Sequence, residues 1–125
     1  MSFNNIECKT INFQSVAGIS APIVHSFLTG PTGFSLTEPN LYLMVQNVTG
    51  VTGVNSVMLP APSSLATGVV STIVCSDGST LTGPANGLLT VVSTDSSTIY
   101  GLKSMGASTP AVLQFYNGGS NWTGI

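Results

Sequence analysis

The chain has 125 residues, and only 5% of them are charged: two lysines, no arginine and four acidic residues, beside one histidine. A chain of this length forms one domain with a substantial core. Catalytic, metal-binding and nucleic-acid-binding sites are built largely from those scarce residue types. We therefore expect no enzymatic activity, no cofactor, no bound metal and no nucleic-acid partner.

The low charge also predicts self-association. Hydrophobic residues make up 42% of the chain, and its mean hydropathy is +0.44. Little charge is left to oppose contact between copies, so we expect a homotrimer that covers apolar surface. No apolar run approaches the roughly 18 residues of a spanning helix, and the N-terminal sequence lacks the basic and apolar regions of a signal peptide. We expect no membrane partner.

Most segments are rich in Val, Thr, Ser, Ile and Leu, and 14 glycines and 7 prolines separate them. Helix-period apolar stripes are absent, so the pattern predicts an all-β protein. In chain order, the predicted strands span residues 10–16, 23–28, 41–48, 54–59, 69–75, 88–93, 98–103, 111–116 and 121–125. The fold class that we expect is an antiparallel β-sandwich or a jelly-roll-like barrel.

The clearest turn lies at Asn117-Gly118-Gly119, between an apolar run and the segment that contains Trp122. Asn and Gly both tolerate the positive φ that a primed hairpin turn needs. The pattern therefore predicts a hairpin between residues 111–116 and 121–125.

Three ionisable side chains deserve testing as catalytic groups. Asp77 and Asp95 could form the carboxylate pair of a glycosidase, but both lie in turn-like sequences that favour bonds to local backbone. His25 has no Gly-x-Ser-x-Gly nucleophile motif to serve, and its apolar neighbours indicate a strand. We interpret all three as structural.

Cys8 and Cys75 are far apart in the sequence and show no Cys-x-x-Cys spacing. With a single histidine in the chain, they do not form a zinc motif. Since no export signal is present, we expect both cysteines to be free thiols.

Tyr100, Tyr116 and Trp122 are the candidate contact residues for an interface or a ligand. Exposed aromatic rings could stack on a sugar, with Asn and Ser side chains binding its hydroxyl groups. A single tryptophan in a hairpin is more often an anchor of a core or an interface. Both roles remain open at this point.

Several features follow one another from about Leu41 onward. A strand ends in Leu59-Pro60, a Pro- and Ala-containing loop reaches Gly68, and a further strand ends near a polar glycine turn at residues 73–78. Residues 112–122 close the series with an apolar strand, an Asn-Gly turn and a tryptophan. This order resembles a module of virion surface proteins from tailed phages and large DNA viruses, found in tail fibres, capsid decoration proteins and knobs.

The resemblance implies a homotrimeric, non-enzymatic structural protein. It would decorate or cement a capsid, or form a short fibre or knob, with the major capsid protein or other virion proteins as partners. It implies a location on the virion after assembly in the host cytoplasm. The alternatives are a fibre tip that binds a receptor or host glycan, and a bacterial adhesin-type subunit.

Residues 1–125 are expected to form a single β domain, with residues 41–125 as the fibre- or decoration-like module. Residues 1–40 lie outside the resemblance and contain alternating segments such as Ile11-Asn12-Phe13-Gln14. They would either complete the sandwich as edge strands or attach the protein by adding a strand to a capsid sheet.

Overall fold

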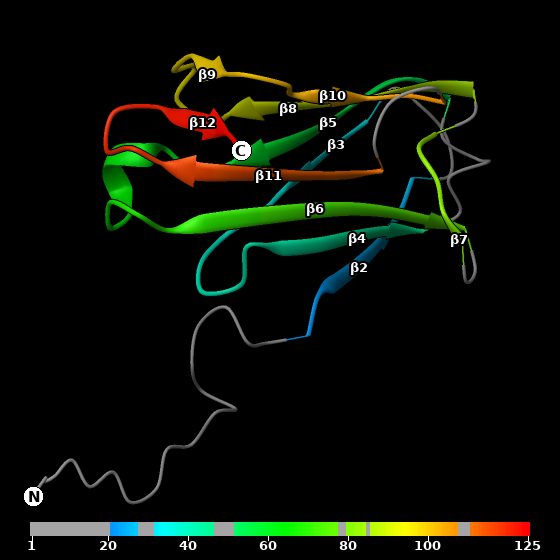
Figure 1. The fold of residues 1–125 in the computed structure, drawn as a ribbon, viewed down its shortest axis with the longest axis horizontal. Helices are drawn as coiled ribbons and strands as arrows, with labels where there is room; N and C mark the ends of the chain where they lie inside the picture. The colour runs from blue at the N-terminus through cyan, green and yellow to red at the C-terminus, as the bar shows by residue number, and fades with distance from the viewer. Residues whose placement is uncertain (1–20, 28–31, 47–51, 78–79, 85, 108–110) are drawn as a thin grey trace, which may run out of the picture.

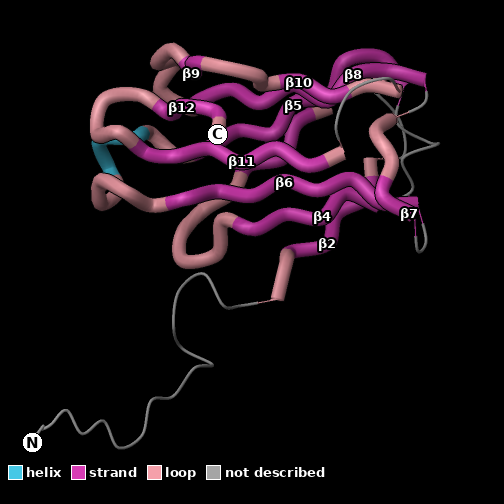
Figure 2. The backbone as a smooth tube through the Cα atoms, in the orientation of Figure 1, coloured by secondary structure: helices cyan, strands magenta, loops and turns pink. Residues whose placement is uncertain are grey.

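The computed structural model describes residues 21–27, 32–46, 52–77, 80–84, 86–107 and 111–125. In these ranges the backbone forms two β-sheets, whose strands lie one above the other in Figure 1. A short 3-10 turn, η3 (Pro62–Ser64), is the helical segment visible in Figure 2. The predicted all-β sandwich is confirmed, while the predicted strand at residues 10–16 lies outside the described residues.

The larger sheet contains most of the strands. Its spatial order is β2 (Ile23–Ser26), β4 (Tyr42–Gln46), β6 (Val70–Asp77), β11 (Val112–Asn117), β12 (Trp122–Gly124) and β9 (Ile99–Tyr100), with β7 (Thr80–Leu81) paired to β6. The smaller sheet has the order β10 (Ser104–Met105), β8 (Asn86–Ser93), β5 (Thr52–Leu59) and β3 (Gly33–Ser35). Thus β2 and β3, from the first 40 residues, are edge strands of the two sheets.

The sheets are mixed, which corrects the expectation of purely antiparallel pairing. Strands β2 and β4, β4 and β6, β3 and β5, and β5 and β8 all pair in parallel. From β2 to β6 each strand lies in the other sheet from the strand before it: β2, β4 and β6 belong to the larger sheet, and β3 and β5 to the smaller one. The chain therefore re-enters each sheet in the same direction as before. Parallel neighbours therefore follow from the crossing path, which local sequence does not reveal.

The predicted strand at residues 98–103 is wrong as a single element. The chain forms β9, leaves the larger sheet, and then forms β10 in the smaller one. Gly101 makes this possible, because its φ of 86° lies in a region that other residues rarely adopt. A Cβ atom at Gly101 would also lie 3.3 Å from the Cα atom of Gly124.

The core lies between the inner faces of the two sheets. Alternation places Leu43 and Val45 of β4, and Leu113 and Phe115 of β11, inward. The smaller sheet contributes side chains of the same kind from β5, β8 and β10. The buried cluster comprises Phe27, Leu36, Leu41, Leu43, Val45, Val57, Leu59, Ile73, Cys75, Leu89, Val91, Ile99, Met105, Leu113, Phe115 and Trp122.

The predicted C-terminal hairpin is confirmed, but its turn is not the expected one. Asn117 is the last residue of β11 and pairs with Trp122, so four residues connect the strands. The positive φ belongs to Gly119, at 104°. Asn117 is fully buried: its Nδ2 donates to the carbonyl oxygens of Pro62 and Ala66, and its Oδ1 accepts from the Gly119 N–H. The side chain thereby ties the η3 loop to the hairpin.

Replacing Asn117 by alanine should destabilise the protein by about 2 to 4 kcal/mol, because three hydrogen bonds of a buried side chain are lost: those to the Pro62 and Ala66 carbonyl oxygens and the one from the Gly119 N–H. Asn121→Ala is the control, since its side chain makes one exposed bond, to the Thr98 carbonyl oxygen. Urea unfolding of both variants measures the difference. Equal midpoints would show that the buried bonds of Asn117 contribute no more than the exposed one.

Candidate functional site

The outer side of the larger sheet forms an exposed surface, which we call the large-sheet face. Its members point away from the core because each alternates with a core residue and lies opposite another member on the next strand. They are Val24 and Ser26 of β2, Tyr42, Met44 and Gln46 of β4, Val70, Thr72 and Val74 of β6, Val112, Gln114 and Tyr116 of β11, Thr123 of β12 and Tyr100 of β9. Val74 is the buried member of the set, with an exposed fraction of 6%.

Two of the three candidate contact residues lie in one row of this face. Tyr116 is opposite Thr123, and Thr123 is opposite Tyr100. The side chains of Tyr116 and Tyr100 are 43% and 54% exposed. Since adjacent strands lie about 4.8 Å apart, the two rings start about 10 Å apart on the same side of the sheet.

Trp122 lies on β12 beside Thr123, and its side chain points to the opposite side of the sheet, toward the core. It is fully buried, and its Nε1–H donates to the carbonyl oxygen of Pro60 at 2.9 Å. The ring therefore lies in the core of a single chain, which corrects its assignment as an exposed ligand or interface contact. The core is the other role that the sequence allows for Trp122, and the alternation of Trp122 with Thr123 agrees with it.

The large-sheet face carries no charged side chain. The charged residues in the described ranges are Glu38, Asp77, Asp95 and Lys103, which lie in the β3–β4 connection, at the end of β6 and in the connections on either side of β9. The main polar contact on the face is internal, because Gln114 Nε2 donates to Thr72 Oγ1 at 3.1 Å. The face thus presents aliphatic, methionine and tyrosine side chains around the bonded pair of Gln114 and Thr72, with Gln46 Nε2 donating to Met44 Sδ nearer the β2 edge.

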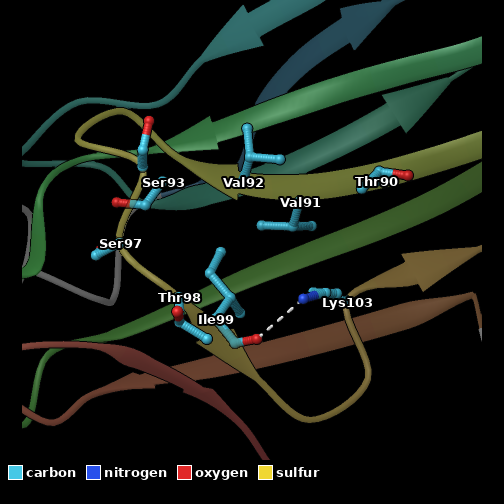
Figure 3. A pocket seen from close by; sticks show the side chains of 9 residues that line it. Thr90, Val91, Val92, Ser93, Ser97, Thr98, Ile99 and Lys103 are labelled. Atoms are coloured by element: carbon cyan, nitrogen blue, oxygen red, sulfur yellow. Dashed lines mark hydrogen bonds between the residues drawn. The ribbon is translucent and has the colours of Figure 1, made fainter.

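A hollow of about 450 Å³ opens at the side of the sandwich, where β8 approaches β9. In Figure 3, Ser97 and Lys103 lie at its opposite ends, and Lys103 Nζ donates to the carbonyl oxygen of Ile99 at 3.2 Å. Its lining comprises Thr90, Val91, Val92, Ser93, Ser96, Ser97, Thr98, Ile99 and Lys103. The lining combines hydroxyl groups, three aliphatic side chains and one ammonium group, and it includes no carboxylate or imidazole that could pair with the ammonium group.

The candidate acids do not form a pair in the structure. Asp95 lies in the turn after β8, where Oδ1 accepts bonds from the Ser93 hydroxyl at 2.7 Å and the Ser97 N–H at 2.9 Å. Hydrogen bonding by Ser93 and then by Ser97 lowers the pKa of Asp95 below its ordinary value. Asp77 is exposed at the far end of β6. The predicted turn role of Asp95 is confirmed.

His25 lies on the inner side of β2, between two aromatic rings. Its ring stacks on Phe34 at 4.2 Å and meets Phe27 edge-on at 4.6 Å. Phe34 belongs to β3 of the smaller sheet, so these contacts join the edge strands of both sheets. Within the described ranges, no three His, Cys, Asp or Glu side chains are grouped closely enough to hold a metal ion.

Cys75 is a free thiol on the inner side of β6, with Sγ 3.0 Å from Met105 Sδ. Burial raises the pKa of the Cys75 thiol from 9.0 to about 12, because an apolar surrounding disfavours the thiolate. A thiol in this state is a poor nucleophile at neutral pH. Cys8 lies outside the described residues.

Comparison with known proteins gives no relative: no protein-family profile, curated protein or solved structure matches this chain. In the described part of the chain, no helix has the length and apolar character needed to cross a membrane.

Trp122→Ala should lower the free energy of unfolding by about 3 to 5 kcal/mol, because it removes a fully buried aromatic ring. Tyr116→Ala, on the exposed side of the same hairpin, is the control, and we expect a loss of less than about 1.5 kcal/mol. Urea unfolding at low protein concentration measures both. A Trp122 variant as stable as the native chain would contradict the core assignment.

Cys75 should make the protein sensitive to alkali. An unfolded thiol ionises near its ordinary pKa of 9.0, whereas the buried Cys75 thiol stays protonated up to about 12. Unfolding therefore releases a proton between these pH values, and stability falls as the pH rises. The native chain should lose more stability from pH 8 to pH 10 than Cys75→Val, in which the other titrating groups are the same. An equal loss in both proteins would contradict the raised pKa.

Proposed function

We propose that this chain is a non-enzymatic structural subunit of a virus particle. In this proposal, copies of the chain form a homotrimer that decorates or cements the capsid, or builds a short fibre or knob. The observation that carries the proposal is the large-sheet face, an uncharged surface of aliphatic and tyrosine side chains that spans six strands.

The chemistry of this face suits a protein–protein contact. The buried centres of interfaces are depleted in charged residues and enriched in tyrosine and other aromatic residues. Val70 and Val112 are 44% and 40% exposed, so apolar surface remains available beside Tyr100 and Tyr116. Contact with another protein would remove this surface from water at little electrostatic cost.

The resemblance of residues 41–125 to fibre and decoration modules supports the virion as the setting. A particle offers a lattice of repeated sites, and subunits that work by shape and packing need few charged residues. In this setting the partners are further copies of the chain and the major capsid protein or another virion protein, and assembly takes place in the host cytoplasm.

Immunogold labelling tests the proposal. Antibodies raised against the purified protein should label particles from the source of the sequence, and quantitative mass spectrometry should count its copies per particle. Hundreds of copies indicate decoration, and a few dozen indicate fibres at the vertices. Absence of the protein from purified particles would contradict a virion role.

A second function, recognition of a receptor glycan, is favoured by the row that contains Tyr116, Thr123 and Tyr100. Two exposed rings with a hydroxyl group between them match the needs of sugar binding, which combines stacking on the sugar face with hydrogen bonds. Glycan-array binding that is lost in the Tyr100→Ala/Tyr116→Ala double variant would support this function. Binding that survives in the variant would assign the sugar to another part of the molecule.

A further inference from the structure

We infer that the large-sheet face is the surface through which one copy of this chain packs against a second copy. The inference deepens the proposed structural role, because it assigns the assembly contact to named residues. It rests on the size of the face, on its internal hydrogen bonding, and on the placement of charges around it.

The size of the face suits a specific contact. The six strands lie about 4.8 Å apart and range from two residues in β9 to eight in β6. With a mean length of about five residues at roughly 3.3 Å each, they give a surface of roughly 25 by 17 Å. Side chains make the accessible area larger than this flat projection. The face thereby approaches the about 600 Å² per partner of the smallest stable interfaces.

Exposed apolar groups are spread across this surface. Val24 at one edge is 54% exposed, and Tyr100 at the other edge is 54% exposed. Val70, Val112 and Tyr116 lie between them on the central strands β6 and β11, at 44%, 40% and 43%. A partner that covers the face therefore removes apolar surface from water at both edges and on the central strands, although Val74 of β6 is already buried.

Covering the centre of the face costs little in lost hydration. Gln114 and Thr72, near its centre, already bond each other, so both keep a partner when water is excluded. No charge on the face would have to be neutralised. These two properties separate the face from an ordinary exposed sheet, where charged residues usually resist pairing and stacking.

The placement of charge favours a second copy over a charged partner. The four charged side chains of the described ranges lie in connections and at a strand end, off this face. A partner with charged groups at the contact would bury them without counter-charges, which is costly. A second copy brings a surface that is equally free of charge and equally rich in valine and tyrosine.

The outer side of the smaller sheet is a weaker candidate and provides matched controls. It is also uncharged, with Val54, Leu88 and Val92 exposed, but its outward residues include no aromatic side chain. Tyrosine is among the residues that contribute most to association at interfaces.

The same contact can build the proposed homotrimer. Three large-sheet faces would meet around a threefold axis, and each face would contact both of the other copies.

The test places a lysine on each sheet in turn. Val112, on β11, is 40% exposed, and Val92, on β8, is 37% exposed, so Val112→Lys and Val92→Lys add the same charge at equivalent depth. A second matched pair is Val70→Lys and Leu88→Lys, at 44% and 45%. Sedimentation equilibrium of the full-length protein at micromolar concentrations measures association, and circular dichroism and thermal melts at high dilution verify folding.

We expect the native protein and both smaller-sheet variants to be oligomeric. Val112→Lys and Val70→Lys should associate at least about 30-fold more weakly, because each copy brings an unpaired charge to the contact. Val112→Leu should retain native association. A monomeric native protein, or equal association of the two variants in each pair, would overturn the inference.

These outcomes are independent of the virion role. Association depends on the purified chain alone, whereas immunogold labelling depends on the particle. A protein that associates through this face but is absent from particles would retain the inference and lose the proposed function. A monomeric protein that is found on particles would support the virion role and contradict the inference.

Discussion

The structure depends on the packing of two mixed sheets around one shared core, and the buried side chain of Trp122 joins them directly. Its ring belongs to β12 of the larger sheet, while its N–H bonds the carbonyl oxygen of Pro60, directly after β5 of the smaller sheet. A buried indole needs this bond, since an unpaired N–H in the core would cost free energy. The same contact orients β12 so that Thr123 points outward between Tyr100 and Tyr116.

Sequence pattern predicts the strands better than it predicts their pairing. Apolar alternation in β4 and β11 is readable in the sequence, and both strands lie close to their expected positions. Parallel pairing follows from the repeated crossing of the chain between sheets, which is a property of the whole fold. The split into β9 and β10 depends on Gly101, whose positive φ has no distinguishing signal in a chain with so many glycines.

For the candidate site, too, the sequence indicates the residues but not their arrangement in space. The aromatic residues Tyr100, Tyr116 and Trp122 stand out in the sequence, but their grouping depends on β12 pairing with both β11 and β9. Alternation separates Trp122 from its neighbour Thr123, and the partner strands then place the tyrosines beside Thr123. The absence of charge from the large-sheet face needs the complete sheet order, because its members come from six strands.

The crossing path of the chain also has a consequence for the rate of folding. Strand β6 pairs with β4 on one side and with β11, which comes much later in the sequence, on the other. Strand β5 pairs with β8, although β6 and β7 come between them in the sequence. Each pairing closes a long loop before any hydrogen bond compensates for the lost chain entropy. Such a chain folds slowly, on the scale of milliseconds to seconds. Its apolar strands stay uncovered during that time, and Lys103 and the acidic residues in the connections are among the few charges that keep neighbouring chains apart.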